Sequence, residues 1–134
     1  MVKAFEPVFD KLEDLFIDKL PGYIGRINES YNDGCILKDF ENQNLFSFSN
    51  KLPCFKFSTE TADYSDKDRI IENTVFCVGL TLLLPPLGDK GCMIFWRYVE
   101  AIKSMVEDVG VCNVWNSIRV SNVIKNVVYL RIVL

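Results

Sequence analysis

The sequence predicts an α+β domain in which two amphipathic helices pack on an antiparallel β-sheet, in the order helix, strand, strand, helix, strand, strand. Two observations lead to this prediction. Apolar residues recur at steps of three and four along two separate segments, as on one face of an α-helix. Elsewhere, apolar and polar residues alternate, or apolar residues run unbroken between turn signals, as in β-strands. Helices and paired strands arranged in this way are typical of α+β architecture.

The first helix is expected over residues 2–20. Its apolar side chains recur at steps of four and three residues, at Phe5, Phe9, Leu12 and Phe16. Charged residues fill the opposite face. Pro21-Gly22 should stop or kink this helix, because proline interrupts helical hydrogen bonding. Residues 21–50 contain Asn-Asp-Gly and scattered Asn and Ser, so an irregular segment is predicted there, with room for one short helix or strand.

Two strands are expected before the second helix. In the first, "CFKFSTETA", Phe55, Phe57 and Thr59 alternate with polar residues, as in a half-exposed strand. The second runs from Arg69 to Leu84 and ends in a nearly unbroken apolar run before two prolines. A transmembrane helix needs about 20 apolar residues, so this shorter run predicts a strand of a buried sheet and no membrane span.

The two faces of the long strand differ in character. One is wholly apolar and is assigned to the core: Phe76, Val78, Leu80, Leu82 and Leu84. The other face carries smaller residues, among them Val75, Gly79 and Thr81. Small residues permit close approach by another backbone or side chain. This second face is therefore predicted to be only partly covered by its own chain and to lie in a subunit interface.

The second helix is expected from Cys92 to Val109, and Gly110 stands where a C-terminal cap belongs. Its apolar stripe steps by four and three residues through Phe95, Val99, Ile102, Val106 and Val109. The neighbouring Trp96 could indicate a ligand pocket, but core packing is the better interpretation of this aromatic pair. Two strands joined by a short turn complete the chain.

The register of this last hairpin follows from its apolar pattern. A two-residue turn at Lys125-Asn126 would pair Val120 with Arg131 and mix the faces. A three-residue loop, residues 124–126, instead pairs Val120 with Leu130, Ile118 with Ile132 and Asn122 with Val128. The three-residue loop is therefore predicted. Asn126 is expected to take the left-handed conformation that such loops need.

The same register places Arg119 across from Arg131 on the outer face, with Ser121 across from Tyr129. Like charges at such a cross-strand position destabilise the sheet unless an anion neutralises them. The hairpin contains no carboxylate, and the densest acidic stretch of the chain lies elsewhere, at Glu60, Asp63, Asp66, Asp68 and Glu72. We expect this stretch of a neighbouring subunit to meet the two arginines at a head-to-tail interface.

Composition limits the classes of function. The chain of 134 residues is expected to be a single domain, with a formal net charge of −3 that does not suit a general nucleic-acid binder. Its amphipathic start lacks the basic-then-apolar plan of a secretory signal, so a soluble, cytoplasmic protein is expected. The absence of histidine removes the commonest general base, most zinc sites and the Ser-His and Cys-His catalytic pairs.

Neither a cofactor nor a metal is predicted. The acidic stretch at residues 60–72 could hold a divalent cation, but it lacks the spacing of a calcium loop and is better explained as solvated. The five irregularly spaced cysteines are expected to be free thiols, with Cys77 and Cys92 in the core. No catalytic carboxylate pair is assigned.

The layout resembles a known family. The chain has an amphipathic helix, a variable stretch, a strand near "P-x-F-x-F" (Pro53, Phe55 and Phe57), the strand "RIIENTVFCVGLTLLL", a second amphipathic helix and a final "VVYLRIVL" strand. In this order it is similar to the tail terminator, or tail-completion, proteins of long-tailed phages and prophages. The resemblance rests on the order and spacing of elements after residue 50, and residues 23–50 have no counterpart in it.

This resemblance implies a non-enzymatic subunit that forms a ring, commonly a hexamer, on the last ring of the tail tube. There it would stop tube growth and present a surface to the head connector. It would be cytoplasmic during assembly and part of the virion tail afterwards. Two other classes remain open: a small cytoplasmic adaptor or chaperone-like subunit, and an enzyme that acts on an anionic small molecule through Arg119 and Arg131.

Overall fold

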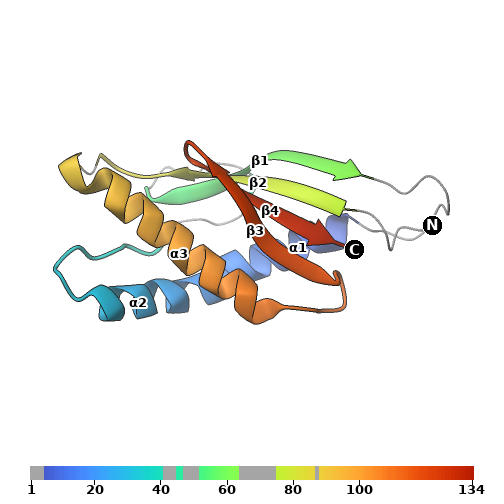
Figure 1. Ribbon diagram of the computed structural model, residues 1–134, viewed down its shortest axis with the longest axis horizontal. Coiled ribbons are helices and arrows are strands. Elements are labelled where there is room, and N and C mark those ends of the chain that lie inside the picture. The colour runs from blue at the N-terminus through green and yellow to red at the C-terminus, as the bar shows by residue number, and fades with distance from the viewer. Residues whose placement is uncertain (1–4, 41–44, 47–51, 64–74, 87) are drawn as a thin grey trace.

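A computed structural model of the chain describes residues 5–40, 45–46, 52–63, 75–86 and 88–134. The elements follow one another as an N-terminal helical segment, strands β1 (Cys54–Asp63) and β2 (Val75–Leu83), helix α3 (Gly91–Val109), and strands β3 (Ser117–Ile124) and β4 (Val127–Val133). A short 3-10 turn, η3 (Gly88–Lys90), leads into α3. The predicted α+β class and order of elements are confirmed (Figure 1).

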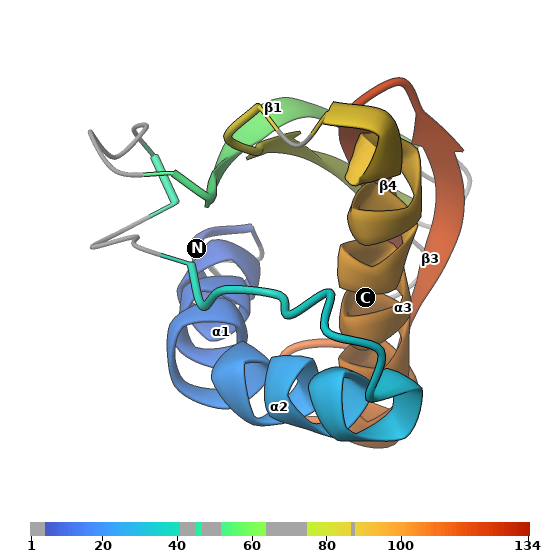
Figure 2. The same cartoon turned by 90° about the vertical axis from the view of Figure 1, so that its left-hand side faces the viewer.

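The four strands form one antiparallel sheet in the order β1-β2-β4-β3. β4 therefore lies between β2 and β3, which places the C-terminal strand inside the sheet. The sheet curves, and the helices lie on its concave side (Figure 2). One face of the sheet thus packs on the helical layer, while the other face points away from it.

The N-terminal helical segment is longer than the sequence predicted. It consists of α1 (Glu6–Asp14), a π-helical turn η1 (Leu15–Lys19) and α2 (Leu20–Tyr31). The expected end at Pro21-Gly22 is wrong, and so is an irregular segment beginning at residue 21. Pro21 stands in the first turn of α2, where its missing N–H is tolerated. The chain widens into π geometry just before the proline, since a regular α-helix would bring its ring against the carbonyl four residues earlier.

The connection after α2 is extended and is held by side chains. Asn32, in the left-handed conformation with φ 43°, ends the helix. The amide of Asn28 then accepts a hydrogen bond from Leu37 N at 2.7 Å and donates one to Leu37 O at 3.0 Å. The hydroxyl of Tyr98 on α3 does the same for Lys38, at 3.0 and 2.8 Å. These side chains satisfy backbone groups that have no strand partner in this segment.

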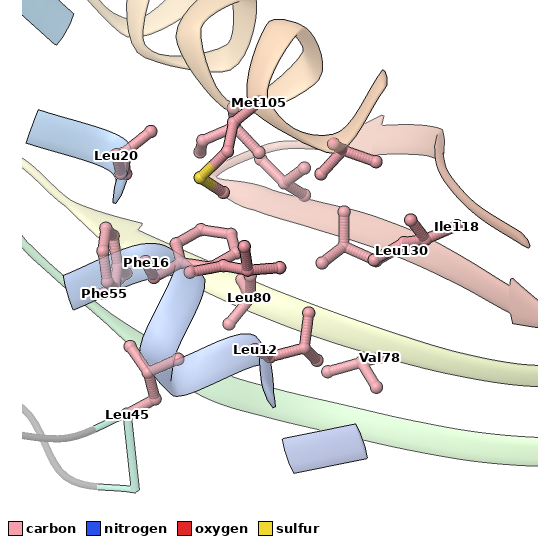
Figure 3. Packing of buried hydrophobic residues seen from close by; sticks show 14 of the residues in the cluster. Leu12, Phe16, Leu20, Leu45, Phe55, Val78, Leu80, Met105, Ile118 and Leu130 are labelled. Carbon is pink, nitrogen blue, oxygen red and sulfur yellow. The ribbon is translucent and has the colours of Figure 1, made fainter. Parts of the chain in front are cut away.

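The core lies between the helices and the concave face of the sheet. Val78, Leu80, Leu130 and Ile132 are fully buried on β2 and β4, as the apolar face of each strand predicts. Figure 3 shows the side chain of Phe16 between the sheet and the helical layer, close to Leu80. On α3, Val99, Ile102 and Val106 of the predicted stripe are buried. The expected core strand and the second helix, which begins one residue earlier than predicted, are therefore confirmed.

The C-terminal hairpin combines a correct prediction with a wrong one. Val120 pairs with Leu130 and Ile118 with Ile132, as predicted, but Ile124 pairs with Val127, so the turn has two residues. The register is kept by a bulge at Ser121, which makes Asn122, not Ser121, the partner of Tyr129. The pairing of Asn122 with Val128 is therefore also wrong: Val123 takes that place. Beyond the bulge it is Val123 that packs against the core.

The turn itself also differs from the prediction. Lys125, with φ 55°, takes the left-handed conformation that was expected of Asn126. Asn126 instead fastens the hairpin to β2, because its carbonyl accepts a hydrogen bond from Leu82 N at 2.8 Å. Its side-chain amide donates to Leu82 O at 3.3 Å. The asparagine therefore serves as a cross-strand link and the lysine bears the backbone strain.

Two cysteine placements are also corrected. All five cysteines are free thiols. Cys54 is the buried one, whereas Cys77 is half-buried on the face of β2 that points away from the helices, and Cys92 is exposed. Cys77 follows the two-residue period of its strand, and Cys92 stands in the first, exposed turn of α3.

Glycine at position 125 should stabilise the protein. Lys125→Gly removes the left-handed strain of an L-residue and adds backbone freedom to the unfolded chain, for a net gain of about 0.5–1 kcal/mol in the free energy of unfolding. Asn126→Gly is the matched control and should lower that free energy, because it removes the hydrogen bond to Leu82 O without relieving a positive φ. Urea unfolding of both variants measures the two changes. A gain at position 126 and a loss at position 125 would contradict this account of the turn.

Candidate interaction surface on the outer face of the sheet

The face of the sheet that points away from the helices is the candidate functional site, and we call it the outer face. Cross-strand pairing arranges its residues from β2, β4 and β3 in four rows. The rows are Val75–Val133–Ser117, Cys77–Arg131–Arg119, Gly79–Tyr129–Asn122 and Thr81–Val127–Ile124.

The outer face is mainly apolar or small over β2 and β4. Val75, Cys77, Thr81, Val127 and Val133 are all half-buried, shielded in part by their neighbours in the sheet. Such a face is unusual for a sheet that meets only water, where polar residues normally alternate outward. The interface residues predicted from the sequence on β2, Val75, Gly79 and Thr81, lie together here, with Tyr129 beside Gly79.

Two arginines stand side by side at the edge of this apolar area. Arg119 pairs directly with Arg131 in the backbone register, as predicted, and Arg131 pairs on its other side with Cys77. Arg131 is half-buried and Arg119 is exposed. No carboxylate of the described residues forms an ion pair with either guanidinium. Directly opposed like charges cost up to about 1 kcal/mol, so the pair destabilises an isolated chain.

The acidic residues predicted to meet these arginines are only partly within the described structure. Asp63 ends β1 and pairs with Val75 in the backbone register. Asp66 and Asp68 lie outside the described residues, as does the first part of the long strand expected from Arg69. The predicted contact between this stretch and a neighbouring subunit stays a prediction.

Sequence reasoning missed a second polar cluster, which joins α2 to α3. The guanidinium of Arg97 is buried, with 5% of the residue exposed, and donates to both carboxylate oxygens of Asp33, at 3.0 and 2.6 Å. It also donates to the carbonyl of Cys35 at 3.3 Å and stacks on the ring of Tyr31, 3.9 Å from the ring centroid. A two-pronged ion pair with cation–π stacking is specific to arginine and fixes the end of α2 against α3.

One feature of the sequence could have indicated this cluster. Arg97 stands four residues before Ala101 and eight before Met105, so it falls on the apolar side of an otherwise well-formed amphipathic helix. A charged residue at such a position needs a partner. The partner, Asp33, lies in the Asn-Asp-Gly turn, whose sequence indicates a turn but no ion pair. Only the tertiary fold brings the two together.

Hydrogen bonding shifts the pKa values in this cluster. The Arg97 side chain holds the pKa of the Asp33 carboxyl well below its usual range, and the same hydrogen bond raises the pKa of Arg97. The hydroxyl of Tyr31 donates to Glu100 at 2.7 Å, which raises the pKa of the tyrosine. Burial raises the pKa of Tyr98 to about 12. These pKa shifts keep Asp33 and Arg97 charged and keep the two tyrosine hydroxyls protonated, as their hydrogen bonds require. We call the Asp33–Arg97 pair the clamp, because it holds the end of α2 against α3.

A groove lies between η1, α2 and the end of α3, with a volume of about 470 Å³. Leu15, Met105 and Val109 contribute apolar lining, and Tyr23 bridges the groove by donating to Asp108 at 2.7 Å. Arg26 stands over the Tyr23 ring and 3.9 Å from Asp108. Tyr23, Arg26 and Asp108 are thus partnered with one another. Asp18 and Lys19 also line the groove and form no ion pair within the described part of the chain.

Two kinds of site are not found in the described part of the chain. Its histidine, cysteine, aspartate and glutamate side chains form no group of three or more that could hold a metal ion. None of its helices combines the length and the apolar character that crossing a bilayer requires.

No protein-family model matches this chain, and neither does any characterised protein or solved structure. The class of protein is therefore defined by the fold and the surface themselves. They describe a two-layer α+β protein whose helices cover one face of the sheet (Figure 2). The other face presents an apolar area beside two arginines that form no ion pair with a described carboxylate.

The clamp predicts a specific loss of stability in acid. The pKa of the Asp33 carboxyl is lower in the folded chain than in the unfolded chain, where it is about 3.9. Ionised Asp33 therefore contributes fully to the free energy of unfolding above about pH 4, and this contribution is lost as the pH falls toward the pKa of the folded chain. Asp33→Asn should thus be less stable than the wild type at pH 6, and the difference should narrow below about pH 4. Urea unfolding midpoints between pH 2 and pH 7 measure it. Glu29→Gln, an exposed carboxylate on α2, is the control and should give a smaller difference; equal behaviour of the two variants would exclude the clamp.

Proposed function

We propose that this chain is a non-enzymatic assembly subunit that binds further copies of itself through the outer face and forms a ring, as the resemblance to tail terminator proteins of long-tailed phages implies. In this proposal the ring, for example a hexamer, ends the tail tube and offers a surface to the head connector. The partners are therefore other copies of the chain, the tail-tube protein and the connector protein.

One observation carries the proposal: the outer face is apolar and small over two strands and holds two arginines that form no ion pair with any carboxylate the structure describes. The small, half-buried Thr81 leaves room for a neighbouring chain to approach the sheet, whereas Gly79, expected in the same interface, is already buried within its own chain. An anionic group on that neighbour would relieve the repulsion between Arg119 and Arg131. A bound partner would cover the apolar area and neutralise the two arginines, and each effect would stabilise the assembled state relative to the isolated chain in water.

The order of elements also supports the proposal. In the arrangement helix, two strands, helix, two strands, the helices gather on one face of the sheet and leave the other for a neighbour. The resemblance to tail terminators rests on this same order. The absence of histidine from the whole chain argues further for a structural role over a catalytic one.

The oligomeric state tests the proposal directly. Light scattering over a concentration series should show one assembly of fixed size, and electron microscopy should show closed rings. A dimer that does not grow would favour an adaptor instead. A chain that stays monomeric at every concentration would contradict self-assembly altogether.

Thr81→Arg should weaken this assembly while leaving the fold intact. Thr81 is half-buried on the outer face, so a bulky charged side chain there obstructs a partner without entering the core. We expect a smaller assembly by light scattering and an unchanged circular dichroism spectrum. Asn113→Arg adds the same charge at an exposed position between α3 and β3 and should assemble like the wild type. If Thr81→Arg unfolds the chain, its own chain covers that face and the interface is wrong.

A further inference from the structure

The helical layer carries its own set of unmatched charges. Asp10 and Asp14 on α1 and Asp18 on η1 are exposed and follow one another at steps of four residues. We call these three residues the acidic stripe. Because Val8, Leu12 and Phe16 of the same segment are buried toward the sheet, the stripe lies on the side of the helix that faces away from it.

The acidic stripe is electrostatically unfavourable in a single chain. Like charges four residues apart on a helix repel one another. Among the described residues, no cation forms an ion pair with any of the three aspartates. A row of like charges that destabilises its own helix without a local partner indicates a role outside the chain.

The stripe and the outer face stand on opposite sides of the two layers. One side presents three aspartates, and the other presents Arg119 and Arg131. The opposition of charge is local to the acidic stripe and the arginine pair, because the helices also expose cations such as Lys19 and Lys103. Contact between two outer faces about an axis near the arginine pair would bring four cations together, which is unfavourable. Contact between an outer face and a stripe brings opposite charges together.

We propose that the acidic stripe of one copy docks against the Arg119–Arg131 pair on the outer face of the next copy. This inference rests on the proposed function, since it names the surface that the outer face binds. Ile17, 36% exposed and placed between Asp14 and Asp18 in the sequence, offers an apolar contact to the apolar part of that face. Each copy then uses two different surfaces, which is the head-to-tail contact that builds a ring when its rotation closes.

Charge complementarity of this kind acts mainly on the rate and orientation of association. Exposed ion pairs contribute little affinity each, and added salt screens them. Apolar contact around Tyr129 and Thr81 must then supply much of the binding. Assembly should therefore be slower, but not abolished, when salt is raised for the wild type.

Two charge-reversal variants test the docking. The sheet variant is Arg119→Glu with Arg131→Glu, and the stripe variant is Asp10→Lys with Asp14→Lys and Asp18→Lys. Each alone should associate about tenfold more slowly, or not at all, at low ionic strength. Circular dichroism and urea unfolding confirm that each variant is folded.

Mixing the two variants gives the decisive result. The sheet variant keeps a native stripe and the stripe variant keeps a native outer face, so one native interface can form between them. We expect assemblies in which the two variants alternate, because a native stripe meets a native outer face at one contact and a reversed stripe meets a reversed outer face at the next. A chain that carries all five substitutions should assemble again, since its charges are exchanged but still complementary.

Other outcomes separate the inference from the proposed function. A wild type that stays monomeric overturns both. If the wild type assembles and the stripe variant assembles equally well, the stripe is not the partner, and the proposed function stands. In that case Asp63→Lys with Asp66→Lys and Asp68→Lys tests the acidic stretch that the sequence predicted as partner. If the sheet variant and the stripe variant both assemble normally while Thr81→Arg does not, charge docking is excluded and the outer face remains the interface.

Discussion

The burial of one face of the sheet under the helical layer is the constraint on which the rest of the structure depends. Val78, Leu80, Leu130 and Ile132 have no exposed surface, so the register of β2 and β4 cannot shift by one residue without moving polar groups into the core. The position of every residue on the outer face follows from that register. Arg119 meets Arg131 because Ile118 and Val120 must face inward with their partners.

The parts of the fold that the sequence predicted correctly are those set by a strong apolar period. The faces of β2, the stripe of α3 and the pairing of Val120 with Leu130 each follow from hydrophobic alternation that only one arrangement satisfies. The opposed arginines were predictable for the same reason. They are a consequence of the apolar residues on the other face, not of any preference of their own.

The errors arise where a local signal has more than one solution. Pro21-Gly22 can end a helix or begin a new turn of one, and the π turn at residues 15–19 decides for the second. The acidic stripe ran through the predicted first helix, but its lack of a partner emerges only when the tertiary neighbours of Asp10 and Asp14 are known. The clamp between Arg97 and Asp33 spans 64 residues of chain, a distance over which no local pattern carries information.

The bulge at Ser121 has a consequence for how this hairpin can vary. A two-residue turn with a bulge and a three-residue loop without one place the same residues, Ile118, Val120 and Leu130, in the same pairs. The sequence predicted one of these solutions and the structure uses the other, so the pairs before the bulge are the same in both and only beyond it does Val123 replace Asn122 opposite Val128. The bulge therefore acts as a length buffer: one residue can be inserted or deleted near the turn and absorbed there before it reaches the packed strands. The tip of the hairpin can therefore change in length while the buried pairs of β3 and β4 stay as they are.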